Sequence, residues 1–501
     1  MDVLAAYAPL LPEAVLAIGA LALLVYGVFR PDTDGEAVKI GWLALLVMAA
    51  AGWAVVQAGA PASLFNGAFN DDAFSRFVKL LVLAGAGGAL ILSLDEMRER
   101  AAFKFELPVI MLFATVGMFL MASAGDLISL YLGLELQSLA LYVLAAIRRD
   151  DAKASEAGLK YFVLGALSSG MLLYGASLLY GFAGTTAFAG IAAAANGGGQ
   201  NMMLVLGLVF LLVGIAFKVS AVPFHMWTPD VYEGAPTPMT AFLAAAPKVA
   251  AMALFIRVVG AALPGIKPQW QQIVVFLSIA SMVFGALGAI GQTNIKRLMA
   301  YSSIANMGYA LVPLAAGGPE GVEGVLVYMA VYIVMTLGAF ACIISMRRES
   351  GPVEAITDLS RRTGGGPRRS RGPRAHQSAP GLRHGDVHVL AGRHPAARRL
   401  LRQVLRLPAC HQGRPLLARR HRRRRQCGWG LLLPAYRQDH VLRRGGGPVP
   451  RRARQGRRRD AGRAAAHAGV PAGDRLAVRC GTGRRGGRRR GEVPQIGIAQ
   501  A

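Results

Sequence analysis

Lysine is absent from residues 351–501 of this 501-residue chain. Of the 55 basic residues in the whole chain, 36 lie in that segment, all of them arginine, and only 7 acidic residues accompany them. The first 350 residues are nearly balanced, with 19 basic and 21 acidic side chains. Because lysine and arginine both attract phosphate, a basic segment selected to bind polyanions normally mixes the two. The missing lysine therefore argues against an ordinary basic binding tail and divides the chain into two unlike parts.

Cysteine is scarce, and a basic leader is missing. The chain has no Cys-x-x-Cys pair, and its cysteines and histidines do not combine into a zinc-finger pattern, so neither a zinc site nor a disulfide framework is expected. Its four cysteines are Cys342, Cys410, Cys427 and Cys480. The N-terminus, MDVLAAYAPLLPEAVLAIGA, lacks a basic n-region and carries Glu13. It is expected to be a retained first membrane span rather than a cleaved signal peptide.

Long apolar runs fill the first 350 residues. Each is long enough to cross a hydrocarbon core, and in lipid every backbone amide needs an internal partner, so the runs are expected to be helices. We place eleven of them, at residues 9–29, 40–58, 76–94, 107–123, 127–147, 160–183, 202–222, 238–263, 272–292, 298–314 and 323–346. The prediction is an all-α polytopic membrane domain over residues 1–350.

The basic residues between these runs alternate from one side to the other. The loops on one side of the membrane carry most of the basic residues, and those on the other side hold only Arg76 and Lys267. The richer set consists of Arg30, Lys39, Arg98, Arg100, Lys104, Arg148, Arg149, Lys153, Lys160, Lys296, Arg297, Arg347 and Arg348. The positive-inside rule places the richer set in the cytoplasm and the N-terminus in the periplasm. An odd number of spans agrees with that orientation.

Three ionisable side chains stand well inside the predicted spans. Glu135 lies in LISLYLGLELQSLALYVL, Lys218 in LLVGIAFKVSAVPF and Lys248 in TAFLAAAPKVAAMALF. A charge at membrane depth is costly, so such residues usually face a partner or a hydrated cavity. For any one lysine, a static ion pair or a side chain that extends to the interface is the simpler alternative. Two lysines and a glutamate together favour a path for protons or ions.

Prolines accompany both lysines. Pro223 follows Lys218 by five residues, and Pro247 directly precedes Lys248. Proline removes an amide donor and disrupts a helical hydrogen bond, so the helices are expected to kink or break nearby. Broken helices in membranes are tolerated where they line water or protein. A lysine there, with a movable glutamate partner, would be a two-state proton carrier.

The connector PFHMWTPDVYEGAPTPMTAF holds two further candidates. His225 and Asp230 could relay protons from the cytoplasm, or they could cap helix ends and pack at the interface. Composition favours the capping role for Asp230 and leaves both roles open for His225. Lys160 is also open: its neighbours favour a cytoplasmic anchor, while its position at the start of a span allows a place in the path.

Taken together, these segments resemble the antiporter-like membrane subunits of respiratory complex I. The amino-acid sequences of three segments are most similar to the subunit N family of bacterial NADH–quinone oxidoreductase: YLGLELQSLALYVLAA (131–146), FKVSAVPFHMWTPDVYEGAPTPMTAFLAAAPKVA (217–250) and NIKRLMAYSSIANMGYALV (294–312). The sister subunits L and M differ around the intramembrane glutamate and after TPD. The resemblance covers about residues 1–360.

The resemblance implies a proton-translocating subunit without a cofactor of its own, since other subunits of the complex use NADH and quinone. It implies that Glu135 pairs with Lys218 and that Lys248 is the central-axis lysine. The family has an antiporter-like bundle of fourteen spans, in which spans 4–8 and 9–13 form inverted five-helix repeats. A further lysine normally stands in the twelfth span, within a GIPPLAGFFGKFYVF-like motif. The second repeat is therefore expected to be truncated here.

The tail at residues 351–501 is explained by a shifted reading frame. Read one base later, the codons of Gly392 to Leu407 permit AGIPPLAGFFGKFYVF, with the lysine codon straddling Gln403 and Val404. In the same way, residues 431–442 permit YYYLRIVKTMYF. Off-frame reading of GC-rich DNA also yields Arg, Gly, Pro and Ala in bulk and almost no Lys. The slip is expected between Leu359 and Arg383, and the tail is expected to be a disordered, off-frame product that replaces spans 12 to 14.

Two other functions fit parts of the sequence. The first 350 residues could form a stand-alone cation/proton antiporter or a hydrogenase-linked subunit of the same fold. The tail, taken at face value, could be an arginine-rich arm for RNA or anionic lipid. The favoured expectation is a multi-pass subunit of complex I in the bacterial inner membrane, whose partners are other membrane subunits and the lipid bilayer, with no nucleic acid and no metal.

Overall fold

The computed structural model describes residues 7–31, 33–100, 105–197, 201–348, 351–352 and 354–357. All of them belong to a single compact unit of the structure. Nearly all of the predicted tail, from residue 358 onward, lies outside the described residues. The shifted frame and the disorder of the tail therefore stay predictions.

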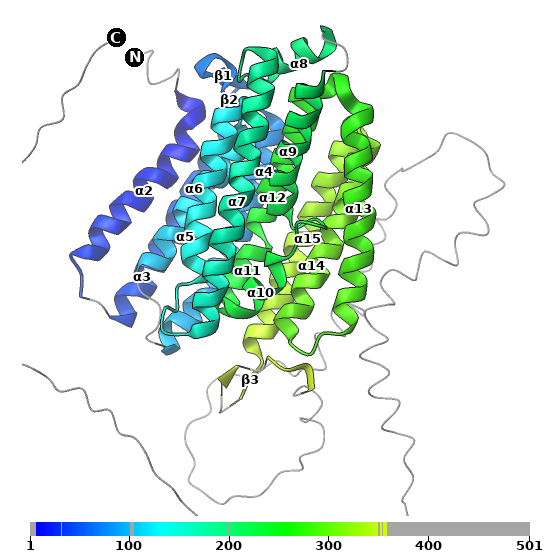
Figure 1. The fold of residues 1–501 in the computed structure, drawn as a ribbon. Coiled ribbons are helices and arrows are strands. Elements are labelled where there is room, and N and C mark those ends of the chain that lie inside the picture. Colours follow the sequence, from blue (N-terminus) through cyan, green and yellow to red (C-terminus); the bar gives the residue numbers. More distant parts are fainter. Residues whose placement is uncertain are drawn as a thin grey trace, which may run out of the picture. The chain divides into compact units, whose positions relative to one another are not determined.

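Long helices packed side by side form the described part of the chain (Figure 1). The long helices are α2 (Leu11–Val28), α3 (Asp34–Val56), α4 (Ala73–Arg100), α5 (Glu106–Ser123), α6 (Leu127–Ala145), α7 (Ala152–Ala183), α9 (Met202–Val219), α13 (Lys267–Ile290), α14 (Ile295–Ala316) and α15 (Gly318–Ser345). Between α9 and α13 lie three shorter helices, α10 (Trp227–Gly234), α11 (Thr237–Ala244) and α12 (Ala246–Arg257). The other helical elements of the described residues are helix α8 (Phe188–Gly197) and the short turns η1 (Ala8–Leu10), η2 (Phe65–Gly67), η3 (Val258–Ala262) and η4 (Pro264–Ile266).

Every predicted span coincides with helix in the structure. Within the described residues, ten helical segments are long and apolar enough to cross a membrane. The remaining predicted span, 298–314, corresponds to α14, which has 22 residues and packs between α13 and α15. It is more polar than the others, because its first turn holds Lys296 and Arg297 and its middle holds Asn306. The all-α membrane architecture is confirmed, and α14 joins the bundle beside the ten more apolar segments.

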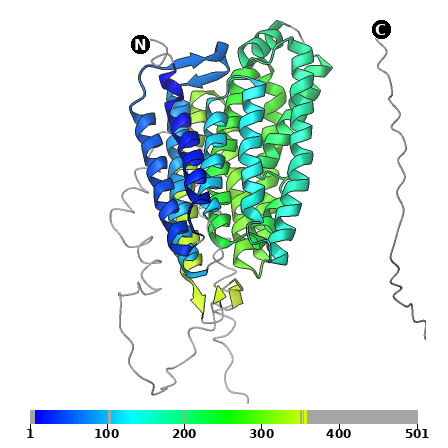
Figure 2. The same cartoon turned by 90° about the vertical axis from the view of Figure 1, so that its left-hand side faces the viewer.

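Two short hairpins depart from the all-α prediction and mark the two ends of the bundle. Strands β1 (Ala62–Leu64) and β2 (Phe69–Asp71) pair antiparallel, with Ala62 opposite Asp71, and the turn η2 (Phe65–Gly67) joins them. Strands β3 (Arg347–Arg348) and β4 (Gly351–Pro352) form the second hairpin. The hairpins lie at opposite ends of the bundle (Figures 1 and 2), which we call the β1–β2 end and the β3–β4 end.

The helix breaks predicted beside the prolines are present. Helix α9 ends at Val219, and Ser220 adopts a left-handed conformation with φ of 64°. The span that holds Lys248 is split at Ala245, whose φ and ψ of −98° and −86° are not helical. Because Pro247 has no amide hydrogen and its ring crowds the preceding turn, it disrupts the regular helix at this point. Both lysines thus stand next to interrupted helices.

Glycines allow the helix backbones that carry the site to approach closely. A Cβ added at Gly175 of α7 would lie 2.5 Å from the amide nitrogen of Leu211 in α9. Between α5 and α6, a Cβ at Gly117 would lie equally close to the amide nitrogen of Gln137. Small residues at such crossings are typical of membrane bundles, where packing rather than hydrophobic burial drives association. These crossings hold α9 against α7, and α6 against α5.

Gly175→Leu should destabilise the bundle by about 1–3 kcal/mol, because the added side chain forces α7 away from α9. The matched control is Gly170→Leu in the same helix, since a Cβ at Gly170 meets nothing within 4 Å. Thermal unfolding of the two purified variants in detergent measures the difference. Equal unfolding temperatures would show that the crossing tolerates the added volume.

Candidate lysine pair at broken helices

Lys218 is buried at the end of α9 and held by hydroxyl groups. Its side chain is 5% exposed, and its Nζ donates to Ser138 Oγ at 2.7 Å and to Tyr142 Oη at 3.4 Å. Ser138 and Tyr142 lie on α6, one turn apart, so a single face of that helix supplies both acceptors. The Tyr142 ring also faces the ammonium, with Nζ 5.6 Å from its centroid. Lys218 therefore has neutral hydrogen-bond acceptors at contact distance.

Glu135 lies on α6 one turn before Ser138, and it does not contact Lys218 directly. Among the described residues, no ion pair within 4.0 Å joins Glu135 to a basic group, and its Oε1 is buried without a hydrogen-bond partner. The predicted pairing of Glu135 with Lys218 is thus not a direct contact in this arrangement. Ser138 lies next to Glu135 on the helix and accepts the hydrogen bond from Lys218 instead.

Lys248 stands at the start of α12 and contacts the broken end of α9. Its side chain is 1% exposed, and its Nζ donates to Ser220 Oγ at 3.0 Å and to the Val219 carbonyl at 3.4 Å. Carbonyl groups at a helix C-terminus carry partial negative charge and favour a nearby cation. The Tyr232 ring lies 5.8 Å from the ammonium. The α9 terminus thus solvates Lys248 without supplying a full counter-charge.

One break in the chain therefore serves both lysines. Lys218 is in the last turn of α9, and Ser220, two residues later, binds Lys248. Trp227 fixes this terminus, because its indole nitrogen donates to the Phe217 carbonyl at 3.0 Å. Within the described part of the chain, the hydrogen bonds of both buried ammonium groups go to neutral oxygens, so each group can lose a proton without stranding a paired carboxylate. Chemically, the arrangement can pass a proton between two sites.

Lys160 belongs to a different group of charges, near the β3–β4 end. Its Nζ lies 2.7 Å from Glu156 and 2.9 Å from Asp230, and its side chain is 41% exposed. Asp230 also binds Arg297 at 2.7 Å, and Arg297 in turn binds Glu233 at 3.0 Å. This network ties α7, α10 and α14 together at the bundle end. The structure thus places Lys160 with Asp230 and not with Lys218.

His225 lies in the connector between α9 and α10, half-buried, and its Nδ1 has no hydrogen-bond partner among the described residues. Burial lowers the pKa of its imidazole, and a hydrogen bond to the Pro223 backbone only partly offsets this effect. The structure does not bring His225 into contact with either buried lysine. Its role in a proton path stays a prediction.

The Asp230 network should make the fold more sensitive to acid. Burial alone would raise the pKa of Asp230, but hydrogen bonds from Lys160 and Arg297 outweigh it and hold this pKa below its ordinary value. The carboxylate therefore stabilises the fold above its unfolded pKa of about 3.9, and this contribution is lost as the pH falls through the lower folded pKa. Because Asp230 is partly exposed, the effect should be about 0.5–1 kcal/mol.

The measurement is thermal unfolding against pH for the unmodified chain and for Asp230→Asn. The difference in unfolding temperature between them should shrink as the pH falls below about 4. Asp34→Asn, at an exposed carboxylate, is the control and should change little at any pH. A difference between Asp230→Asn and the unmodified chain that is independent of pH would contradict the prediction.

Sequence analysis missed the hydroxyl groups that hold the lysines. Ser138 and Tyr142 follow Glu135 by three and seven residues, a spacing that puts all three on one face of a helix. That periodicity was available in the sequence as a signal. Ser220 carried no such signal, because only the fold brings it to Lys248. Within the described ranges, no group of three or more His, Cys, Asp or Glu side chains could hold a metal ion.

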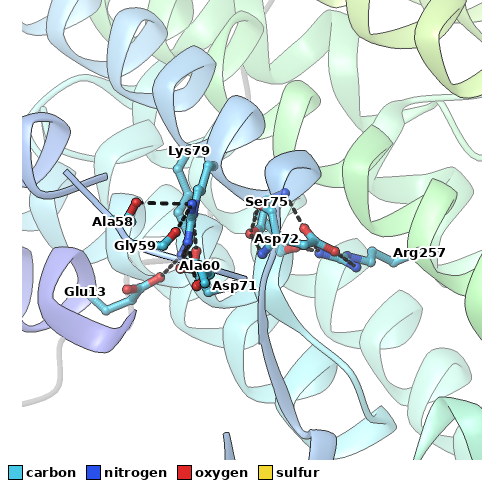
Figure 3. Close-up of polar contacts among 11 residues, drawn as sticks. Glu13, Ala58, Gly59, Ala60, Asp71, Asp72, Ser75, Lys79 and Arg257 are labelled. Carbon is cyan, nitrogen blue, oxygen red and sulfur yellow. Dashed lines mark hydrogen bonds and ion pairs between the residues drawn. The ribbon is translucent and has the colours of Figure 1, made fainter. Parts of the chain in front are cut away.

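Sequence analysis also missed charged side chains in the spans near the β1–β2 end. Lys79 of α4 is fully buried and contacts Glu13 of α2, and Arg257 at the end of α12 binds Asp72 through two hydrogen bonds of 2.7 Å (Figure 3). Glu13 had served only to argue against a signal peptide. Glu13, Lys79 and Arg257 are each an ionisable residue inside an apolar run, which is the signal that identified Lys218.

Interrupted helices with buried lysines, set in an all-helical membrane bundle, define an antiporter-like membrane subunit. The family model described as NADH:quinone oxidoreductase/Mrp antiporter, TM, matches residues 124–362, a range that holds both lysines and Glu135. The Mrp complex of Dietzia sp. DQ12-45-1b shares the fold, with a TM-score of 0.59 at 21% identity over 69% of this chain and 66% of that chain.

Relatives with higher sequence identity show which antiporter-like subunit this chain is most similar to. NADH-quinone oxidoreductase subunit N of Parvibaculum lavamentivorans is 58% identical over 354 residues, which cover 71% of this chain and 73% of the relative. The Methylobacterium nodulans subunit N is 56% identical over 358 residues, 72% and 74% of the two chains. A chain of respiratory complex I from Thermus thermophilus is 35% identical with a TM-score of 0.57, covering 69% of this chain and 72% of that chain. The chain belongs to the NADH-quinone oxidoreductase subunit N family and is a multi-pass protein of the bacterial inner membrane.

Proposed function

We propose that this chain is a proton-translocating membrane subunit of NADH:quinone oxidoreductase, with Lys218 and Lys248 as successive proton carriers. The observation that carries the proposal is the shared break at the end of α9, where both ammonium groups are buried and contact only neutral oxygens. A proton held on Lys218 would pass to Lys248 when the second lysine is neutral. The Ser220 hydroxyl at the shared break contacts Lys248 Nζ and can both accept and donate a hydrogen bond, whereas the Val219 carbonyl can only accept one. Glu135, one turn before Ser138 on α6, would act on Lys218 through its charge and not by direct contact.

The membrane orientation follows from the loop charges. Lys153, Lys160 and Arg297 gather near the β3–β4 end, which we assign to the cytoplasm, and the N-terminus and the β1–β2 hairpin then face the periplasm. Protons would enter near the Asp230 network, which is partly exposed. Lys160 is the member of that network that would pass them inward, and His225 stays an alternative on the same side.

Redox chemistry is assigned to other subunits of the complex, which would use NADH and quinone, so this chain needs no cofactor of its own. Its partners would be the neighbouring membrane subunits and the lipid around the exposed faces of its helices. Relatives and solved structures of the same fold are components of membrane complexes, which supports assembly with other subunits. No nucleic acid enters this account.

The arginine-rich tail is proposed to result from a frameshift in the coding DNA. The match to the family model ends at residue 362, within the interval where the codons predict the slip. The relatives listed above leave about a quarter of their own length unmatched. Sequencing the DNA across codons 355–385 should find one inserted or missing base. An intact frame would remove the frameshift from the account.

Co-purification tests the assignment to the complex. An affinity tag on this chain, expressed in its own host with the frame restored, should recover NADH:quinone reductase activity together with the chain. A stand-alone antiporter would instead purify without NADH:quinone reductase activity, and it would exchange cations for protons when reconstituted alone. A polyanion-binding protein would be indicated by salt-sensitive binding of RNA or anionic vesicles to the isolated tail.

A further inference from the structure

Four charged side chains near the β1–β2 end form what we call the outer cluster, defined as Glu13, Asp71, Arg76 and Lys79. Lys79 Nζ lies 2.7 Å from Glu13 Oε1 and 3.9 Å from Asp71 Oδ1. Asp71 in turn binds Arg76, with contacts of 2.8–3.2 Å. Glu13 comes from α2, Asp71 from β2 and Lys79 from α4, so three elements meet at this point (Figure 3).

The cluster runs from the dry interior to the surface. Lys79 is 0% exposed, Asp71 is 3% exposed, and the Arg76 side chain is 20% exposed. Arg76 also donates to the backbone carbonyls of Gly59 and Ala60, which are exposed at the end of the bundle. A continuous series of polar atoms therefore joins a fully buried amine to the aqueous end of the bundle.

Lys79 lies closer to the β1–β2 end than the lysine pair. Helices α4 and α12 touch where Gly85 meets Ala246, and they run in opposite directions, because Arg257 at the end of α12 binds Asp72 just before α4 begins. Lys79 precedes Gly85 by six residues and Lys248 follows Ala246 by two, so at 1.5 Å per residue Lys79 lies about 6 Å further toward that end. It stands between the level of Lys248 and the surface.

The Glu13–Lys79 contact is not locked in its charged form by surrounding hydrogen bonds. Neither oxygen of Glu13 accepts a hydrogen bond of regular geometry from the described residues, although the residue is only 5% exposed. The ammonium instead faces two aromatic rings, at 5.0 Å from the Phe69 centroid and 5.7 Å from the Phe119 centroid. A buried ion pair repays its desolvation only with excellent geometry and further hydrogen bonds, so the neutral pair competes here with the charged one.

We propose that Glu13 and Lys79 form a second proton-exchange site, on the side where protons leave this subunit. The inference rests on the proposed function for its direction of flow. The proton passes from Lys79 Nζ to Glu13 Oε1, which leaves a neutral amine and a neutral carboxylic acid. Glu13 then releases the proton to water at the helix end, and Lys79 takes up the next proton from the interior. Net charge within the site changes only when the proton leaves or arrives.

The charges around the pair come from few elements. Asp71 faces Lys79 from β2, and Arg76 of α4 balances Asp71. The charged side chains of α3, such as Asp34, stand at its first residues, and α5 carries Glu106 at its first residue, so both helices present apolar side chains to α2 near Glu13. Arg76 and Asp71 therefore offset each other, and exchange within the Glu13–Lys79 pair governs the charge of Glu13.

Dicyclohexylcarbodiimide, an apolar reagent that modifies protonated carboxyl groups in apolar surroundings, tests the proposal on the full 501-residue chain in membranes. Mass spectrometry at about pH 7, where an ordinary carboxyl is ionised, should find the label on Glu13 and not on the exposed Glu320. Lys79→Arg keeps the positive charge but cannot give up its proton. Labelling of Glu13 should then fall about tenfold or more, as one pH unit of protonation corresponds to a tenfold change.

Two further variants complete the test. Lys79→Met removes the counter-charge and should leave Glu13 labelled at least as strongly as in the unmodified chain, because an unpaired buried carboxyl binds a proton. Glu13→Gln should lose the label. The proposal is overturned if Glu13 of the folded, unmodified chain labels no more than in Lys79→Arg, while the denatured chain labels in acid. Since labelling needs neither NADH nor partner subunits, this outcome would leave the assignment of Lys218 and Lys248 untouched.

Discussion

Lys248→Met should abolish NADH-driven proton translocation in a complex that contains the frame-restored chain, and it should leave the amount of assembled complex unchanged. Methionine matches lysine in length and removes a charge that is 1% exposed, so the fold should not suffer and can gain stability. The Ser220 hydroxyl and the Val219 carbonyl then face no ammonium, and the proton path has no carrier between α9 and α12. The rate should fall about tenfold or more, as expected for loss of an essential proton carrier.

Proton uptake by inverted membrane vesicles, followed with a quenched dye during NADH oxidation, measures this effect. The matched control is Lys267→Met, at an exposed lysine near the β1–β2 end, which should pump normally. Unchanged uptake in Lys248→Met with full assembly would remove Lys248 from the path. Loss of assembly would instead assign it a structural role.

Arg257→Gln should cause a large loss of stability. The guanidinium donates to both oxygens of Asp72 at 2.7 Å and to the Ala122 carbonyl at 3.1 Å, so it joins the end of α12 to α4 and α5. Burial alone would raise the pKa of Asp72, but these hydrogen bonds hold it below its ordinary value. Glutamine cannot form the two-pronged contact, and the fold should lose about 2 kcal/mol, an amount typical of hydrogen bonds to charged groups.

Thermal unfolding of the purified chain in detergent tests this prediction. Arg30→Gln is the control, because Arg30 is exposed and its substitution should change stability by less than about 0.5 kcal/mol. Arg257→Lys keeps the charge without the fork geometry and should fall between the two. Equal stability of Arg257→Gln and Arg30→Gln would show that solvent replaces the Asp72 contact without loss.

The helices were predictable because membrane spans leave a strong signal in a single sequence. Apolar length alone located every span, and Pro247 located the break in the span of Lys248. The ends of elements were harder. Helix α7 begins at Ala152, eight residues before the predicted start, since its first turns are polar and lie outside the apolar run. The β1–β2 hairpin left no pattern long enough to be recognised.

The charged residues of the lysine site were predictable from the sequence, but the groups that contact them were not. Lys218 and Lys248 are conspicuous as charges in apolar runs, and the structure brings both to the end of α9. Their actual partners, Ser138 and Ser220, are ordinary small polar residues that occur in many helices without a role. Which hydroxyl meets which ammonium depends on the crossing of α6, α9 and α12, and a single sequence does not specify that crossing.

Lys79 was overlooked for a different reason. It lies only three residues from Arg76, so it passes as part of a loop charge at the end of a span. The fold shows the two residues in different surroundings, with Arg76 partly exposed and Lys79 fully buried beside Glu13. Helix α4 begins at Ala73, so Lys79 lies deeper in the span than Arg76. This distance from the start of the helix distinguishes a buried lysine from one that anchors the span at the membrane interface.

Proton uptake driven by NADH, compared between the 501-residue chain and the frame-restored chain in a host that lacks its own copy, tests the central claim most directly. The account predicts no assembled, pumping complex with the 501-residue chain, because it lacks the twelfth-span lysine, and normal pumping once the frame is restored. Normal pumping by the 501-residue chain, or none by the restored chain in an assembled complex, would contradict the account.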